Sequence, residues 1–293
     1  MITVQTLLVN SLPDVAPEDF FLILSHVTQK DKVSLLAHPD RILTFDEQKH
    51  AEALLARRRR HEPVALLVGH KEFYGRDFIV TADTLIPRPE TELLVETVLG
   101  LCSDIEVTTD QNTTILDVGT GSGNIIISLA KEIEERQLLT HVTYIACDIS
   151  TEALLIAQKN ALRYQVDCPI TFLTSNLLQN IPLPETADSS LIITANLPYL
   201  SEKIYHESAH DVRDFEPQNA LVSGRDGLDH YRRLLPEVKA RAHCFQVCHL
   251  YLEISPEQTP LIDPLILAVF PQAIITVQAD LSGRDRLVTV TVR

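Results

Sequence analysis

Residues 115–124 read Ile115-Leu116-Asp117-Val118-Gly119-Thr120-Gly121-Ser122-Gly123-Asn124. An apolar run that ends in closely spaced glycines is typical of a buried strand, a tight loop and the start of a helix, which together hold nucleotide-type cofactors. A nicotinamide enzyme would carry the wider spacing G-x-G-x-x-G, with a third glycine where Asn124 stands. The spacing therefore disfavours a dehydrogenase.

Strand and helix patterns alternate around this stretch. Strands are expected at 114–118, 142–147, 170–174, 189–195, 247–254, 273–278 and 286–292, and helices from 124 and at 151–163, 228–243 and 257–268. Such alternation implies right-handed crossovers and an α/β fold with a mostly parallel sheet and helices on both faces. Ligands of this architecture bind outside the carboxyl ends of the strands.

The first 70 residues lack strand signals and show the apolar spacing of helices. One such stretch begins at Pro17, and another begins at Phe45 and ends in the basic run Arg57–Arg60. Arginines at the end of a helix complement its dipole, so we interpret this run as a solvated helix end. We expect a helical domain over 1–70, a hairpin or linker over 71–88 and an α/β domain over 89–293.

The composition indicates an acidic, globular chain. It has 293 residues, 45% of them hydrophobic, and 40 acidic against 25 basic side chains give a net charge of −15. Nucleic-acid affinity draws on Lys and Arg contacts, so no direct nucleic-acid binding is expected. No signal-peptide pattern opens the sequence, and no apolar stretch approaches the ~20 residues of a membrane helix. We expect a soluble, cytoplasmic monomer without membrane contact.

The five cysteines are scattered and odd in number, which fits reduced thiols better than a disulfide framework. Cys244 and Cys248 lie between His243 and His249, and this cluster is the one that resembles a metal site. It runs directly into an apolar strand pattern, and no second ligand pair follows at zinc-finger spacing. We expect no metal.

Asn196-Leu197-Pro198-Tyr199, called here the NLPY segment, follows the apolar run 191–195. The Asn196 side chain offers an acceptor oxygen, the Pro198 carbonyl is free of strand pairing, and the Tyr199 ring supplies a flat wall. Together these groups can accept both hydrogens of an amide or an exocyclic amine. We therefore interpret the segment as the site that holds a planar nitrogen for reaction.

Two further polar residues follow predicted strands. Asp148 is placed to accept hydrogen bonds from the hydroxyls of a ribose, although it could also be an acid at a helix start before Ser150. Asn176 could pair with an adenine edge, although such a residue alone is more often part of a turn. Both lie at the sheet edge where the glycine loop and Asn196 are expected.

The chain resembles the HemK/PrmC family of S-adenosylmethionine-dependent methyltransferases from about residue 50 to its C-terminus. The motifs that carry the resemblance occur in the family's order: Glu62-Pro63, Gly69, Glu72-Phe73-Tyr74-Gly75, Ile86-Pro87-Arg88-Pro89-Glu90-Thr91-Glu92, Asp117–Gly123, Asn196–Tyr199, Phe215-Glu216-Pro217, Ala220-Leu221 and Gly224–Leu228. The Pro-Arg-Pro block joined to the NLPY segment is far more specific than either motif alone.

The resemblance implies a class I methyltransferase fold with a seven-stranded, Rossmann-like sheet and a helical N-terminal domain that docks a class 1 peptide chain release factor. It implies methylation of the glutamine of the Gly-Gly-Gln tripeptide at the side-chain nitrogen, with S-adenosylhomocysteine as the product. The residues implied for the cofactor are Gly119, Thr120, Gly121, Ser122, Gly123, Asp148, Asn176, Leu177 and Asn196. Those implied for the substrate amide and the catalysis are Asn196, Leu197, Pro198 and Tyr199.

The chain departs from this family at two places. The family usually has proline where Leu197 stands, and an Asp followed by a large side chain where Asn176-Leu177 stands. An Asn oxygen can still accept a hydrogen bond from an adenine amine. The second departure therefore bears on cofactor affinity.

Two other functions fit part of the pattern. An adenine-N6 methyltransferase of DNA or ribosomal RNA would need the same acceptor groups, and rRNA dimethylases use an Asn-Leu-Pro-Tyr form of the segment. The acidic charge, the long N-terminal domain and the Pro-Arg-Pro block disfavour it. A non-enzymatic cofactor-binding scaffold leaves the acceptor groups beside a cofactor loop without a purpose.

Overall fold

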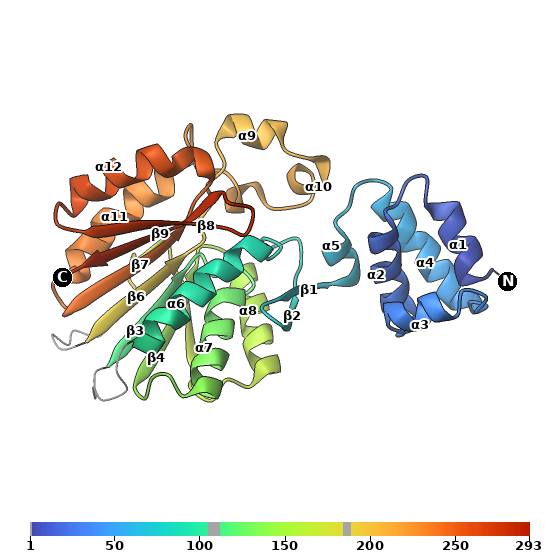
Figure 1. Ribbon diagram of the computed structural model, residues 1–293, viewed down its shortest axis with the longest axis horizontal. Coiled ribbons are helices and arrows are strands. Elements are labelled where there is room, and N and C mark those ends of the chain that lie inside the picture. Colours follow the sequence, from blue (N-terminus) through green and yellow to red (C-terminus); the bar gives the residue numbers. More distant parts are fainter. Residues whose placement is uncertain (1, 105–111, 184–188) are drawn as a thin grey trace. The chain divides into compact units, whose positions relative to one another are not determined.

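The computed structural model describes residues 2–104, 112–183 and 189–293 (Figure 1). The chain divides into two compact units. Unit 1 comprises Met1–His70 and Ala209–Phe215, and unit 2 comprises Lys71–Ser208 and Glu216–Arg293. The short segment Ala209–Phe215 therefore groups with the N-terminal helices, although it lies far from them in the sequence.

Unit 1 is helical. Its helices are α1 (Val4–Ser11), α2 (Pro17–Thr28), α3 (Lys32–Ala37), α4 (Phe45–Arg58), α5 (Val64–Val68) and α10 (His210–Arg213). Helix α4 begins with a capping box in which Thr44 and Glu47 each bond the other's backbone N–H. The core between α2 and α4 contains Phe20, Ile23 and Leu55, all buried.

The arginine run at the end of α4 is paired with acids. Arg57 donates from Nε and Nη2 to the two carboxylate oxygens of Glu62. Arg58 pairs with Asp19 at 2.7 Å, and Arg59 lies 3.6 Å from Asp14. Three of the four arginines thus stabilise unit 1 locally. Exposed pairs of this kind contribute up to about 1 kcal/mol each.

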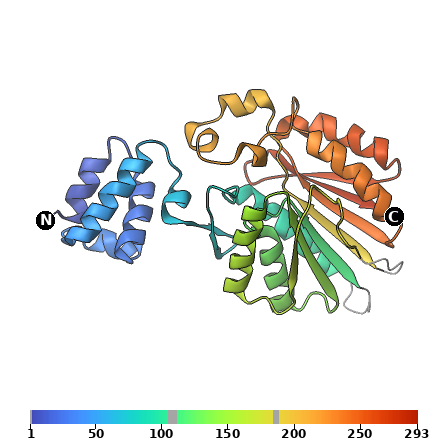
Figure 2. The ribbon, with the colours of Figure 1, turned by 180° about the vertical axis from the view of Figure 1, so that it is seen from behind.

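Unit 2 is built on a seven-stranded sheet in the order β5-β4-β3-β6-β7-β9-β8 (Figure 2). The strands are β3 (Thr113–Val118), β4 (Val142–Asp148), β5 (Ile170–Thr174), β6 (Ser190–Ala195), β7 (Val247–Glu253), β8 (Ile274–Ala279) and β9 (Asp285–Val292). Strand β9 runs antiparallel to both β7 and β8, and the other pairs are parallel. The predicted seven-stranded, mostly parallel fold is confirmed.

Helices cover both faces of this sheet (Figure 1). Helices α6 (Glu92–Asp104), α7 (Asn124–Arg136) and α8 (Thr151–Tyr164) cover one face, and α11 (Asp229–Ala242) and α12 (Thr259–Val269) cover the other. Strand side chains alternate between the faces, so Ile115 packs toward α6 and α7 while Leu116 packs toward α11. This alternation divides the core of unit 2 into two apolar layers.

The remaining elements of unit 2 are short. They are the hairpin β1 (His70–Phe73) and β2 (Arg76–Ile79), helix α9 (Glu202–Glu207), and the 3-10 turns Pro89–Thr91, Gln218–Ala220 and Pro256–Gln258. The hairpin was predicted from the sequence, but α9 and α10 were not. Both helices span under two turns, too short for an apolar period to stand out.

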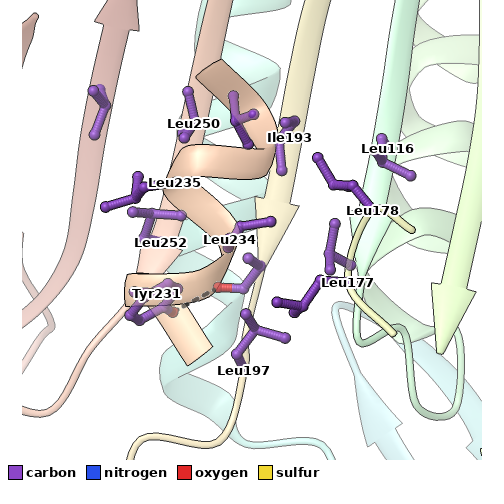
Figure 3. Close-up of a cluster of buried hydrophobic side chains, with 14 of the residues drawn as sticks. Leu116, Leu177, Leu178, Ile193, Leu197, Tyr231, Leu234, Leu235, Leu250 and Leu252 are labelled. Carbon is purple, nitrogen blue, oxygen red and sulfur yellow. Dashed lines mark hydrogen bonds between the residues drawn. The ribbon is translucent and has the colours of Figure 1, made fainter. Parts of the chain in front are cut away.

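The layer beneath α11 extends to the carboxyl edge of the sheet. Figure 3 shows Leu234 and Leu235 of α11 over the sheet, with Tyr231 and Leu197 near the strand ends. The Tyr231 hydroxyl lies 3.1 Å from the Ala195 carbonyl and 2.5 Å from the Glu253 carbonyl, and so joins the ends of β6 and β7. A fully buried leucine contributes roughly 1.5–3 kcal/mol. This packing fixes the place where the chain leaves β6.

Candidate active site

A cavity of about 280 Å³ opens at the carboxyl ends of β3, β4, β5 and β6. The loops after these strands contribute most of its wall: 118–122, 148–150, 175–177 and 196–198. Residues 82–85, Pro87 and Thr91 line it from the segment before α6, and Pro217, Asn219, Ala220 and His230 also contribute. The predicted residues Gly119–Ser122, Asp148, Asn176, Leu177 and three residues of the NLPY segment therefore come together, whereas the predicted Gly123 is not among the residues that line the cavity.

The glycine loop has the backbone conformation that its sequence predicts. Gly119 has φ +75° and Gly123 has φ +80°, in the left-handed region that favours glycine. A Cβ on Gly119 would lie 2.8 Å from Cδ2 of Leu197, and one on Gly123 would lie 3.1 Å from Cβ of Ala157. Glycine at these positions lets the loop approach the NLPY segment and lets α7 start close to α8.

Asp148 ends β4 and holds the neighbouring loops. One carboxylate oxygen accepts from the backbone N–H of Gly121 at 2.9 Å, and the other accepts from that of Ser150 at 2.9 Å. Burial raises the pKa of Asp148, and these backbone donors lower it. Ser150, and not Asp148, caps α8. Each carboxylate oxygen keeps a further lone pair, so Asp148 can also accept from hydroxyls in the cavity.

The two ends of the Asn196 amide group have different surroundings. Its Nδ2 donates to the Thr91 hydroxyl oxygen at 3.0 Å, whereas Oδ1 is buried and makes no hydrogen bond within the described residues. A buried polar atom of this kind requires an explanation. The arrangement fits an acceptor that receives an N–H from a ligand in the cavity.

The other residues of the NLPY segment are in different surroundings. Pro198 lines the cavity, and Leu197 contributes to the wall while only 4% of its surface is exposed. Tyr199 is not among the residues that line the cavity, and its carbonyl accepts from Nε2 of Gln258 at 2.9 Å. Burial raises the pKa of the Tyr199 hydroxyl well above its ordinary value.

Asn176 and Leu177 line the cavity beyond β5. The Asn176 oxygen accepts from Nη2 of Arg233 at 2.7 Å, which leaves its NH₂ group free to donate. Leu177 has φ +56° and is buried, and its carbonyl accepts from the Cys147 thiol at 3.5 Å. The Asn176 oxygen, which was expected to accept a hydrogen bond from an adenine amine, is thus already bonded to Arg233.

Asp117 lies directly behind the glycine loop. It is fully buried and accepts from the hydroxyls of Thr120 at 2.6 Å and Thr194 at 2.7 Å. Burial raises the pKa of Asp117 to about 6, although both hydroxyls lower it. These bonds join the loop to β6.

Several residues that line the cavity or lie beside it were not predicted from the sequence. Thr91 belongs to the Pro-Arg-Pro block, and Glu216 follows Phe215 in a motif that had no assigned role. Glu216 accepts from Nη2 of Arg88 at 2.5 Å and from the Ile86 backbone at 3.1 Å, which ties two distant motifs together beside the cavity. His230 carries no such signal, because nothing near it in the sequence distinguishes it from a surface histidine.

Within the described residues, no group of three or more His, Cys, Asp or Glu side chains has the arrangement of a metal site. No helix in this described part of the chain has the length and hydropathy to cross a membrane.

Comparison with known proteins gives matches over nearly the whole chain. The model of the PrmC N-terminal domain matches residues 6–69, and that of a methyltransferase domain matches residues 109–215. A release factor glutamine methyltransferase of Koribacter versatilis is 42% identical over 74% of this chain and 72% of that protein. One of Bacillus anthracis is 32% identical over 91% of this chain and 89% of that protein.

Among solved structures, the N-terminal domain of human METTL16 in complex with SAH is 15% identical, with a TM-score of 0.51 and 94% of each chain covered. At this identity the likeness concerns the fold alone. It agrees with the methyltransferase-type sheet of unit 2.

Proposed function

The chain belongs to the family of release factor glutamine methyltransferases, and from this premise we propose that it methylates a release factor glutamine with S-adenosylmethionine. One observation supports this function at a particular site: Asn196 lines the cavity, and its buried amide oxygen has no hydrogen-bond partner within the described residues. The acceptor is the side-chain amide nitrogen of the Gly-Gly-Gln glutamine in class 1 release factors.

The residues around the cavity fit the cofactor. The glycine loop approaches closely enough for backbone contact with the amino-acid part, and Asp148 keeps lone pairs for the ribose hydroxyls. Asn176 offers an NH₂ donor to a ring nitrogen of adenine, with Leu177 beside it. When bound, S-adenosylmethionine supplies an electrophilic methyl group on a positively charged sulfur.

The chemistry explains why the NLPY segment needs acceptors. An amide nitrogen is a poor nucleophile because its lone pair is delocalised, so the site must hold it close to the methyl group and in line with it. The Asn196 oxygen and the Pro198 carbonyl can each accept one N–H of the glutamine amide. Both bonds strengthen as that nitrogen gains positive charge, which favours the transition state over the bound substrate.

The family relationship disfavours an adenine-N6 methyltransferase. The net charge of −15 agrees, because nucleic-acid affinity depends on Lys and Arg contacts. We propose further that the chain acts as a cytoplasmic monomer, that unit 1 docks the release factor and that unit 2 carries the transfer.

Label transfer tests this function. The chain is incubated with methyl-labelled S-adenosylmethionine and a release factor, or with RNA or DNA, and the label is located by mass spectrometry. We expect it on the Gly-Gly-Gln glutamine of the release factor. Label on nucleic acid would establish the adenine alternative, and cofactor binding without any transfer would favour a scaffold.

The variant Asn196→Ala tests the site. We expect S-adenosylmethionine to bind with nearly wild-type affinity, while single-turnover transfer falls roughly 100-fold because one positioned acceptor is lost. Calorimetry measures the first quantity and rapid-quench kinetics the second. Equal transfer rates for variant and wild type would remove the amide-holding role from Asn196.

A further inference from the structure

Glu253, the last residue of β7, is a buried carboxyl group that the proposed chemistry does not use. Only 1% of its surface is exposed, and neither carboxylate oxygen makes a regular hydrogen bond within the described residues. Burying a carboxylate without partners is costly, and such groups concentrate at functional sites. Its surroundings therefore deserve a functional explanation.

Glu253 lies at the same level of the sheet as Asn196. Strands β6 and β7 are parallel, and Ala195 pairs with Leu252, so Asn196 and Glu253 follow side by side. The alternation that turns Ile192 and Tyr251 toward α6 places Asn196 and Glu253 on that same face. Thr91, at the start of α6, bonds Asn196 from this side.

The Thr91 hydroxyl is hydrogen-bonded to Asn196 on this face of the sheet. Its oxygen accepts from Nδ2 of Asn196 at 3.0 Å, so its own hydrogen is free to be donated elsewhere. Glu253 lies on the face of the sheet from which Thr91 bonds Asn196, so this hydrogen can be directed toward the carboxyl group. Burial raises the pKa of Glu253 to about 7, and the Thr91 side chain is the largest of the effects that lower it.

We propose that Glu253 is a positioning residue for Asn196, acting through the Thr91 hydroxyl. A carboxylate only accepts, so it holds the hydroxyl hydrogen toward itself, and the Thr91 oxygen must then accept from Asn196. The Asn196 NH₂ group is thereby directed to Thr91, and its oxygen faces the cavity. If these hydrogen bonds ran in the opposite direction, the NH₂ group of Asn196 would face the NH₂ group of the substrate, and neither group can accept a hydrogen bond.

Protonation of Glu253 would release this orientation. A carboxylic acid can donate to the Thr91 oxygen, which frees the Thr91 hydrogen to turn toward Asn196 and lets the amide rotate. The charged and titratable groups around Glu253 are Arg88, Glu90, Tyr199, Tyr231 and Arg286. Both arginines favour the carboxylate and Glu90 opposes it. The orientation belongs to the carboxylate form, so it decreases as the pH falls through the pKa of Glu253.

The inference rests on the proposed function, and a matched pair of variants tests it. Thr91→Val removes the hydroxyl at nearly constant shape, whereas Thr91→Ser keeps it. With a saturating release factor, we expect Thr91→Val to lower kcat roughly 10–100-fold, and Thr91→Ser less than about threefold. Wild-type kcat should fall with acid around pH 7, and this acid limb should be absent in Thr91→Val and in Glu253→Gln.

The double variant Thr91→Val with Glu253→Gln should lose no more activity than either single variant, because both changes disrupt the same series of hydrogen bonds. Activity of Thr91→Val within threefold of wild type, or an unchanged acid limb, would overturn the inference.

A second measurement does not depend on catalysis. Carbon-13 NMR titration of labelled glutamate in the full chain should give Glu253 a higher pKa in Thr91→Val than in wild type or Thr91→Ser, because the donor is lost. A wild-type chain that transfers no methyl group would contradict the proposed function alone, and this titration would still decide the inference. Equal Glu253 pKa values in all three proteins would overturn it.

Discussion

Leu197 shows how one residue outside the family pattern is accommodated. Its side chain is buried against the glycine loop and the layer beneath α11 (Figure 3). Burial raises the pKa of the Tyr231 hydroxyl, and a hydrogen bond from the Leu197 backbone lowers it. The segment is therefore held by packing and by a backbone bond, two interactions that proline would remove.

The variant Leu197→Pro should consequently be less stable, although the family usually carries proline at this position. We expect a loss of roughly 2–4 kcal/mol in the free energy of unfolding, from the lost apolar contacts and backbone donor, with a parallel fall in activity. Denaturant unfolding and methyl transfer measure the two effects. Leu197→Met keeps the volume and should cost under about 1.5 kcal/mol. A stable, fully active Leu197→Pro protein would refute this account.

Asp117 should make stability depend on pH. Its folded pKa of about 6 lies above its ordinary value of 3.8, so the folded state holds the proton more tightly. Stability from this group is then present at low pH and lost as pH rises from about 4 to 6, by roughly 3 kcal/mol for a shift of about two pKa units.

Comparison with Asp117→Asn isolates this contribution, because Asn does not titrate. The stability of wild type minus that of the variant should fall by roughly 2.5 kcal/mol between pH 4 and pH 7, measured by urea unfolding. Parallel stability curves over this range would show that Asp117 keeps an ordinary pKa in the folded protein.

The site residues illustrate what sequence can and cannot predict. The glycine loop, Asp148 and Asn196 were predicted because each follows a strand whose apolar pattern fixes its end. Thr91 and His230 reach the cavity from helix starts, and their side chains have no periodic signal. The Arg233 bond that occupies the Asn176 oxygen joins residues 57 positions apart, and such pairing arises only on folding.

At the scale of elements, the strand 170–174 was predicted with the observed ends, and each of the other sheet strands differs by one residue at one end or, for β8, at both. Buried parallel strands are continuous apolar runs, so their signals are strong. What the pattern does not contain is the order of the strands and the connections between the loops, such as that between Ile86–Arg88 and Glu216.

Removing Arg88 should lower the free energy of unfolding more than removing the arginine of an exposed ion pair. The Glu216 side chain is 1% exposed and that of Arg88 is 29% exposed. Arg88→Ala would leave a buried carboxylate without its charged partner, at a cost of roughly 3 kcal/mol, the lower end for a buried pair. Urea unfolding measures it, with Arg163→Ala on α8 as the control, because Arg163 pairs with Asp77 at 2.9 Å and both of these side chains are exposed. A loss below 1 kcal/mol in Arg88→Ala would show that water replaces the arginine.

At the scale of the whole molecule, the hairpin β1–β2 belongs to unit 2. Phe73 and Phe78 are fully buried in the layer formed by α6 and α7. The Asn160 side chain of α8 donates to the Ile79 carbonyl at 3.0 Å and accepts from its N–H at 2.8 Å. The segment 71–88 is thus joined to unit 2 by packing and by hydrogen bonds, although its sequence resembles a linker.

Two fragments should therefore behave differently. Lys71–Arg293 retains these contacts, and we expect it to fold and to bind S-adenosylmethionine with an affinity near that of the full chain. A fragment that begins at Ile86 loses both phenylalanines and leaves the buried amide oxygen of Asn160 without its donor, the Ile79 N–H. The loss would exceed about 6 kcal/mol at 3–5 kcal/mol for each buried aromatic ring. That loss is comparable to the whole stability of a domain, so this fragment should fail to fold. Circular dichroism and calorimetry distinguish the two.

The folded fragment also tests the proposed docking role of unit 1. Lys71–Arg293 retains the cavity but lacks α1–α5, and it carries Ala209–Phe215 without the helices that this segment groups with. If those helices bind the release factor, kcat/KM on the intact release factor should fall at least tenfold, while transfer to a short Gly-Gly-Gln peptide should stay equal to that of the full chain. A proportional loss on both substrates would indicate damage to the cavity instead. Undiminished kcat/KM on the intact release factor would contradict docking by unit 1, because nothing that the fragment lacks would then contribute to recognition.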